Sequence, residues 1–425
     1  MFNVVALPES FMRQLKEFKK MLGPAISQGE KIPFADNDIN YYLQLQHKRI
    51  ADKGLTIDYE LRNRYKEEKM NPYCNNRKDN YYNNFVYSDQ LSIVRKFKLN
   101  GKKVFSDKRK NLVYMNVSDV ISGEHPDNET YSCPNCGSVS TIFELQNGCP
   151  YCSAQYKMDD LFPKITSYYS IPDQSPNAND IQNGVIVWWI FCIILALCFA
   201  AFQEGKMPWT YVVMHPVFSV IIIPLLFIPG YILSACMLLL RMMIVSLVSI
   251  ITLTLSGKTG SIGSKGKFER MMKNITPGFS YDYFTSKTIA LVKTAVFSEN
   301  ESELLFYNGE PLAPSFKNII DLDYSALMKV RKITHKDNLV TVQTKMFFDN
   351  VLYAENNRVK AKRKVFYATF QRRTDVPINA HFSMTKISCH SCGGSFNAVQ
   401  NRICPYCGNS YNLASDDWIL TELTD

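Results

Sequence analysis

The cysteine pattern constrains this chain more than any other feature of its sequence. Eight of its twelve cysteines form four C-x2-C pairs, with twelve residues between the first two pairs and eleven between the last two. Four thiolates match the tetrahedral preference of Zn²⁺ in a closed structural site. The spacing therefore predicts two zinc ribbons. The expected metal ligands are Cys133, Cys136, Cys149 and Cys152 in the first ribbon, and Cys389, Cys392, Cys404 and Cys407 in the second.

The two ribbons also resemble each other along their length. "SCPNCGSVS…CPYCSAQY" aligns with "SCHSCGGSF…CPYCGNSY", with Tyr156 and Tyr411 at matching places. Gly137, Gly393 and Gly408 each follow a second cysteine, where a positive φ is useful and glycine adopts it most readily. The pattern indicates an internal duplication of one zinc ribbon.

The tetrapeptide CPYC, present in both ribbons, is also the dithiol sequence of glutaredoxin-like enzymes. A redox C-x-x-C is expected at the end of a strand and the start of a helix. "TIFELQNG", before the first CPYC, predicts a short hairpin, and "GNSYNLASDDW", after the second, does not begin like a long amphipathic helix. Extracellular disulfides are disfavoured because no apolar signal-peptide core is present. His125 and His390 lie near sites that already have four thiolates, so we expect no ligand role for them.

An apolar block over residues 184–256 predicts membrane insertion. Val185–Phe202 is uncharged over eighteen residues, just long enough to span a hydrocarbon core of about 30 Å. The run from Tyr211 to Leu255 is broken at Pro229-Gly230. Since reduced ribbons belong in the cytosol, an even number of crossings is expected. The prediction is a helical hairpin and a re-entrant segment in the cell (plasma) membrane, with both soluble parts facing the cytoplasm. Three crossings remain an alternative.

The region after this block predicts a compact α+β domain. A helix is expected from Tyr281 to about residue 300, and Val340, Val342, Thr344, Met346 and Phe348 fall on one side of the first clear strand. "ENNRVKAKRK" predicts a charged hairpin region before a second strand, "VFYATF", and "AHFSMTKI" predicts a last strand leading into the second ribbon.

This order of helices and long antiparallel strands resembles the cone-shaped fold of nuclear transport factor 2. "YDYFTSKTIALVKTAVFSENESELLFYNGEPL" followed by "VQTKMFFDNVL" and "RKVFYATFQRR" is similar to the C-terminal domain of subunit 44 of the mitochondrial inner-membrane translocase and its bacterial relatives. The resemblance implies a docking domain that tethers partners at a membrane, with a possible link to protein translocation. The chain departs from that family by its apolar block and two ribbons, so the import-motor role does not carry over.

The predicted fold class is an α+β multidomain integral membrane protein. "LSIVRKFKLNGKKVF" and "NLVYMNVSDVI" predict a strand pair around an Asn100-Gly101 turn. The expected parts are an N-terminal α+β region (1–130), the first ribbon (131–157), a linker (158–183), a transmembrane segment (184–256), a basic flexible linker (257–275), the scaffold-like domain (276–388), and the second ribbon with the C-terminal tail (389–425).

The sequence favours binding over catalysis. No Ser-His-Asp, paired-carboxylate or phosphate-loop pattern stands out, so we expect no enzyme and no cofactor other than two structural Zn²⁺ ions. The predicted function is a membrane-anchored cytosolic scaffold that binds protein and lipid partners. A thiol–disulfide oxidoreductase and a nucleic-acid-binding ribbon protein are the alternatives. Nucleic acid is disfavoured because, despite the net charge of +9, the ribbons themselves are not very basic.

Overall fold

The computed structural model describes residues 9–64, 73–78, 82–121, 130–172, 265–301, 304–354, 358–376, 386–397, 401–411, 413 and 416–425, with isolated residues between 186 and 243. The chain divides into two compact units. The first combines Met1–Asp173 with Gly260–Asp425, and the second is Gln174–Thr259. The first unit contains both cysteine sets.

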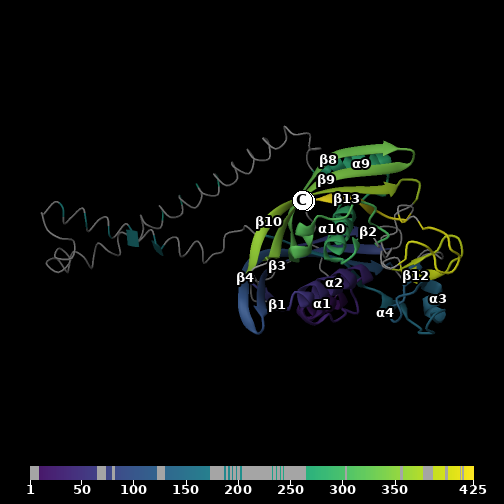
Figure 1. The fold of residues 1–425 in the computed structure, drawn as a ribbon, viewed down its shortest axis with the longest axis horizontal. Helices are drawn as coiled ribbons and strands as arrows, with labels where there is room; N and C mark the ends of the chain where they lie inside the picture. Colours follow the sequence, from purple (N-terminus) through teal and green to yellow (C-terminus); the bar gives the residue numbers. More distant parts are fainter. Residues whose placement is uncertain are drawn as a thin grey trace. The chain divides into compact units, whose positions relative to one another are not determined.

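The first unit contains the same order of elements twice (Figure 1). Each copy has two helices, a series of long antiparallel strands, a small two-stranded ribbon and one closing strand. The N-terminal repeat contains α1 (Glu9–Gln28), α2 (Asn37–Asp52), β1 (Leu55–Asn63), β2 (Tyr73–Lys78), β3 (Tyr82–Leu99), β4 (Lys102–Val120), β5 (Thr130–Ser132), β6 (Val139–Thr141), α3 (Ile142–Asn147), α4 (Met158–Leu161) and β7 (Lys164–Pro172). The C-terminal repeat contains α9 (Lys265–Ile275), α10 (Tyr281–Phe297), the 3-10 helix η3 (Pro314–Asn318), β8 (Ile319–Lys336), β9 (Leu339–Ala354), β10 (Arg358–Arg373), β11 (Lys386–Ser388), β12 (Ser395–Asn397) and β13 (Ile419–Thr424).

The two main sheets have the same strand order. The N-terminal sheet runs β1-β3-β4-β7, and the C-terminal sheet runs β8-β9-β10-β13. In the first sheet β1 and β2 pair in turn along β3, whereas in the second the single strand β8 covers the corresponding length with shifts of register. In both repeats the ribbon is inserted in the sequence between the third and the last strand of this order. These strands are β4 and β7 in the first sheet, and β10 and β13 in the second.

Tight turns close the longest hairpins. Asn100 and Gly101 join β3 to β4 with φ values of 50° and 76°, and Asp337 and Asn338 join β8 to β9 with 51° and 59°. Two consecutive positive φ angles match the right-handed twist of the flanking strands. The predicted Asn-Gly turn is confirmed.

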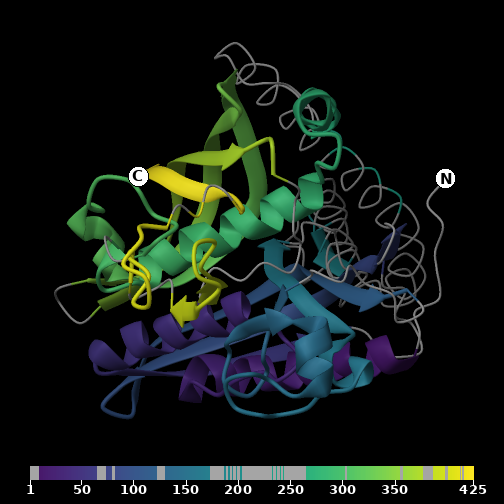
Figure 2. The same ribbon diagram turned by 90° about the vertical axis from the view of Figure 1, so that its right-hand side faces the viewer.

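Helix α10 packs on one face of the C-terminal sheet and also contacts α2 of the N-terminal repeat (Figure 2). The Ser280 side chain caps its first turn by accepting a hydrogen bond from the amide of Tyr283. Phe284 of this helix packs edge-on against Phe370 of β10. The alternation predicted for β9 is confirmed, because Val340, Val342, Met346 and Phe348 are each 0% exposed and Thr344 is 1% exposed.

The two repeats share hydrophobic cores. Ile320, Val351 and Val359 of the C-terminal repeat belong to the buried cluster that is centred on α1, α2 and the N-terminal sheet. Burying one such aliphatic side chain stabilises a fold by about 1.5–3 kcal/mol. Neither sheet is therefore a self-contained domain core.

Buried charged groups also join the repeats. The Arg95 guanidinium on β3 bonds to the carboxylates of Asp321 and Asp323 on β8, the latter at 2.8 Å. Lys287 on α10 lies 3.2 Å from Asp38 of α2 and 2.9 Å from Asp417. Such groups must be paired, since an isolated buried charge costs several kcal/mol.

The membrane prediction requires correction. A membrane-spanning helix needs about 20 consecutive apolar residues, and no helix in the described part of the chain has both the length and the apolar character for this. Most of residues 184–256 lies outside the described residues, as does the first part, 257–264, of the linker predicted over 257–275. The rest of that linker forms helix α9. The finding contradicts the predicted class of integral membrane protein and the predicted location in the plasma membrane. The described fold is instead dominated by two long-stranded sheets.

Three local predictions were also inexact. The β9–β10 hairpin lies where the charged hairpin region was predicted, but β10 begins earlier than expected, because "RVKAKRK" already pairs with the end of β9. "TIFELQNG" forms the short helix α3, whose Thr141 and Glu144 make a capping box. The last strand of the C-terminal sheet is β13, beyond the second ribbon. Most of "AHFSMTKI" lies outside the described residues, and its last two residues, Lys386 and Ile387, belong to β11 within the ribbon.

Candidate metal centres

Each C-x2-C pair forms a turn with the same backbone hydrogen bonds. In the first turn, the amide of Cys133 donates to the carbonyl of Ser138, and the amide of Gly137 donates back to Cys133. The other three turns, which begin at Cys149, Cys389 and Cys404, repeat both bonds. In each turn, the residue two places after the second cysteine is thereby held close to the first cysteine. Both sulfurs then lie on one side of the chain.

The residue after the second cysteine has a positive φ in all four turns. The angle is 71° at Gly137 and Gly393, 73° at Gly408 and 58° at Ser153. The prediction for the three glycines is confirmed. Serine occupies the fourth position at the cost of left-handed backbone strain, which glycine avoids.

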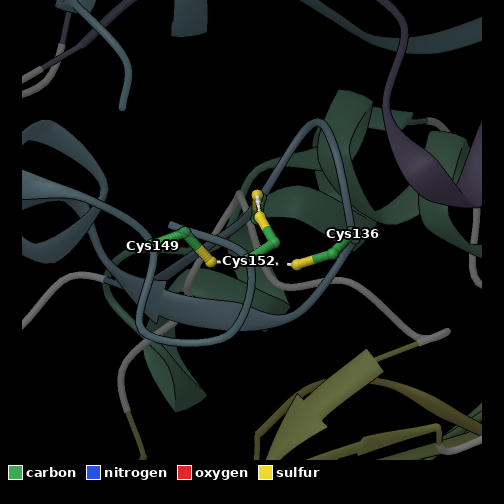
Figure 3. A group of neighbouring side chains, drawn as sticks. Cys136, Cys149 and Cys152 are labelled. Carbon is green, nitrogen blue, oxygen red and sulfur yellow. Dashed lines mark hydrogen bonds between the residues drawn. The ribbon is translucent and has the colours of Figure 1, made fainter. Parts of the chain in front are cut away.

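The eight predicted cysteines lie in two groups of four, and within each group all four sulfurs lie within 4.8 Å of one another. Figure 3 shows the side chains of Cys136, Cys149 and Cys152 turned toward one another. In the first group the sulfurs of Cys133 and Cys152 are 3.7 Å apart, and those of Cys136 and Cys149 are 3.8 Å apart. In the second group the corresponding pairs, Cys389 with Cys407 and Cys392 with Cys404, are both 3.7 Å apart.

These distances fit a tetrahedral metal site. Four Zn–S bonds of about 2.3 Å at tetrahedral angles separate neighbouring sulfurs by about 3.8 Å. A disulfide would require about 2.05 Å, and all eight cysteines are free thiols. Both groups could therefore hold a metal ion with little movement of their side chains.

The thiols have different pKa values because their surroundings differ. Burial raises the pKa of the Cys133 thiol to about 11. At Cys136 burial also acts upward, but hydrogen bonds with the hydroxyl and backbone of Ser138 outweigh it and hold the pKa at about 6. In the second group burial likewise acts upward at Cys389, where the backbone amides of Ser391 and Cys392 lower the pKa to about 6. A bound Zn²⁺ requires all four ligands as thiolates, so metal binding releases the remaining protons.

Aromatic side chains next to the cysteines differ between the two ribbons. In the first, the Cys133 thiol donates to the hydroxyl of Tyr156 at 3.7 Å. In the second, the hydroxyl of the matching Tyr411 donates to Asp416 at 2.6 Å. His390 stacks on the Tyr411 ring and lies 2.9 Å from Asp416. His390 is thus outside the four-sulfur group, and His125 lies outside the described residues.

The two ribbons contact each other through equivalent positions. The amide of Val139 on β6 donates to the hydroxyl of Ser395 on β12 at 2.9 Å, and each of these residues stands three places after a C-x2-C pair. The amide of Ser395 donates in turn to the hydroxyl of Tyr151, the tyrosine of the first CPYC, at 3.0 Å. Sequence reasoning gave no role to Ser395 or Tyr151, because this contact joins residues more than 240 positions apart.

The sulfur contacts do not favour a CPYC dithiol. In each group, the close pairs described above join one cysteine of the first C-x2-C to one of the second. A redox C-x-x-C would instead pair its own two sulfurs at the start of a helix. After Cys152 the next helix is the four-residue α4, which begins at Met158.

Comparisons with protein-family models, curated proteins and solved structures give no match to this chain. The two four-cysteine groups, and the hydrogen bonds that join their ribbons, are therefore the main basis for a functional assignment.

Proposed function

We propose that this chain is a zinc-binding docking protein whose two structural zinc ribbons together present a binding surface for a protein partner. The observation that carries this proposal is the pair of four-sulfur groups with tetrahedral spacing on ribbons that are joined at Ser395. Strands of three residues, such as β5, β6, β11 and β12, are too short to be stable alone, so metal would provide much of their stability.

Exposed apolar side chains support the docking role. Within the described residues of the first unit, the exposed large hydrophobic side chains are Phe143, Tyr151, Ile403 and Tyr406, and all four belong to the ribbons. Phe143 and Tyr406 are each 65% exposed. Interface cores are enriched in aromatic side chains, and such anchors contribute most of the binding energy.

The resemblance of residues 276–388 to translocase scaffold domains is a further, weaker support for a docking role. A link to protein translocation rests on that resemblance alone. No catalytic step is proposed.

Metal analysis tests the first part of the proposal. We expect about two zinc ions per chain purified under reducing conditions, and about one after either Cys136→Ser or Cys392→Ser. A zinc-free chain that reduces disulfide substrates would instead support the oxidoreductase alternative. In that case, zinc supplied during refolding would also fail to bind.

Site-specific crosslinking tests the docking surface. A photo-crosslinking phenylalanine analogue would replace Phe143 in one variant and Tyr406 in another. We expect both variants to capture the same protein in cells, and capture to be lost after Cys136→Ser is added. Lys336, whose side chain is 88% exposed on the β8–β9 hairpin, is the control position. Equal capture at Lys336, or different proteins at the two ribbon positions, would contradict the proposal.

A further inference from the structure

The C-terminal sheet has a second face, opposite α10, on which cations surround two aromatic rings. Side chains alternate between the faces of a strand. Phe370 and Phe366 of β10 point to the helix side, where they contact Phe284 and Phe316. Tyr367, between them, therefore points to the opposite face.

The opposite face is organised around Tyr367 and Phe347. Lys345 is directly across from Tyr367 in the register, and its Nζ lies 5.7 Å from the centre of the Tyr367 ring and 5.4 Å from that of Phe347. The Arg331 guanidinium lies 5.2 Å from the Tyr367 ring. We call Arg331, Lys332, Lys345, Phe347 and Tyr367 the basic sheet face.

A bulge in β8 increases the positive charge of this face. Val330 pairs with Thr344 and Lys332 pairs with Gln343, so Arg331 is an extra residue in the ladder. Bulges redirect side chains and are frequent next to functional sites. Here the bulge lets two consecutive residues, Arg331 and Lys332, both contribute to the same side.

The cations of the basic sheet face lack carboxylate partners in the described part of the chain. Arg331 and Lys345 contact only the rings named above, and Lys332 is exposed. Across the strands, Lys332 is in register with Gln343, Thr369 and then Glu422 of β13. Glu422 accepts a hydrogen bond from Thr369 at 2.8 Å. Some other cations on this sheet are paired, such as Arg373 with Asp375 and Arg363 with Asp349. The uncompensated charge attracts a polyanion.

The arrangement of rings and cations points to one class of polyanion. Single-stranded nucleic acid binds where cations follow the phosphates and bases stack on aromatic rings, and four-stranded sheets provide such platforms. Phe347 is opposite Val365, so it is the diagonal neighbour of Tyr367 across the strands. An anionic membrane fits less well, because both rings are half-buried in the sheet and cannot insert between lipids.

We propose that the basic sheet face binds single-stranded nucleic acid without strong sequence preference, through stacking on Tyr367 and Phe347 and phosphate contacts from Arg331, Lys332 and Lys345. The site is separate from the ribbons, whose low basic content disfavoured nucleic acid in the sequence.

Fluorescence anisotropy of the full chain with short labelled oligo(dT) and oligo(U) tests the proposal. We expect saturable binding at low ionic strength, with affinity falling as salt rises. Arg331→Ala and Lys345→Ala should each weaken binding and reduce the slope of log K against log[salt] by about 0.7. Tyr367→Leu keeps the charge, so it should weaken binding roughly 5- to 150-fold with an unchanged slope.

The matched control is Lys360→Ala combined with Lys362→Ala. These two exposed cations also lie on β10, near its hairpin end, but they alternate to the other face. The control should bind oligonucleotide within about twofold of the unaltered chain, since both phosphate contacts and stacking are retained. Circular dichroism confirms that each variant is folded.

Three outcomes would overturn the proposal. The first is no saturable oligonucleotide binding at low ionic strength. The second is a loss of affinity in the control that is as large as the loss in the Arg331→Ala and Lys345→Ala variants. The third is that the chain binds phosphatidylglycerol vesicles but not oligonucleotides, and that both variants lose this vesicle binding. That result would assign the face to lipid.

Discussion

Arg95 offers the most direct test of how the two repeats are held together. Its side chain is 0% exposed, and its guanidinium bonds to Asp321 and Asp323 of the other repeat and, at 2.8 Å, to Asp107 of its own sheet. Arg95→Met keeps most of the side-chain volume but leaves the two β8 carboxylates buried without this cation. Removing one partner of a buried ion pair typically costs about 3–5 kcal/mol.

Because Lys293 lies near the same carboxylates, we expect the loss of stability in Arg95→Met to be at the lower end of that range. Burial lowers the pKa of this lysine, while the nearby Asp323 and Asp321 act upward. Its Nζ lies 5.0 Å from the centre of the Tyr42 ring, so a second basic group stays near the same carboxylates. We expect Arg95→Met to reduce the free energy of unfolding by about 3 kcal/mol, measured by urea denaturation at neutral pH.

The cost should depend on pH. Burial raises the pKa of Asp323, Arg95 acts downward and Asp321 acts upward, so loss of Arg95 should raise the pKa of Asp323 further. A carboxyl group whose folded pKa exceeds its unfolded value contributes stability below the unfolded pKa, about 4, and this is lost as pH rises through the folded pKa. The deficit of Arg95→Met should therefore be smallest near pH 4 and increase toward neutral pH.

Arg62→Met is the matched control. Arg62 forms a 2.7 Å ion pair with Glu60, but their side chains are 49% and 54% exposed. Exposed pairs contribute about 0–1 kcal/mol, and we expect this variant to remain within that range at every pH. The reasoning is refuted if Arg95→Met costs no more than Arg62→Met, or if its deficit shrinks as pH rises.

Three further predictions concern other parts of the unit. Lys287→Met leaves the buried carboxylates of Asp38 and Asp417 without their shared cation, so the free energy of unfolding should fall by about 3–5 kcal/mol in the same urea assay. Gly23→Ala would stabilise an ordinary helix by about 1 kcal/mol. Here its Cβ would lie 2.5 Å from the carbonyl oxygen of Tyr59, so we expect a loss of about 1–3 kcal/mol, and a gain would contradict the close packing of α1 on β1. Zinc chelation should speed amide hydrogen exchange in both ribbons while β3 and β4 stay protected, and equal loss of protection throughout would show that the ribbons do not unfold separately.

Local patterns were sufficient to predict several features of this fold. The C-x2-C spacing identified all eight cysteines of the two groups, because each turn is formed within six residues. The Asn100-Gly101 turn, the helix from Tyr281 and the buried side of β9 also depend on near neighbours in the chain. These features need no information about distant partners.

Long-range pairing explains what the sequence did not predict. The segment Ile419–Thr424 is six residues long and becomes a strand because β10, about fifty positions earlier, supplies its partner. "RVKAKRK" has a charged composition typical of a loop, yet pairing with β9 holds it in a strand, since tertiary context overrides local propensity. The Arg95–Asp321 contact spans 226 positions, and no local signal identifies it.

The duplicated order of elements provides a physical reason for the contact between the metal centres. In each repeat the ribbon follows the third strand of the path and precedes the closing strand, so both ends of the ribbon are fixed by a sheet. The repeats in turn share buried clusters and the Arg95 and Lys287 ion pairs, which fix one sheet against the other. The two ribbons are thus held at equivalent places on two joined sheets, and Val139 and Ser395, which occupy equivalent positions, are in contact. Loss of metal at one centre should therefore disturb the other ribbon through Ser395 before it disturbs either sheet.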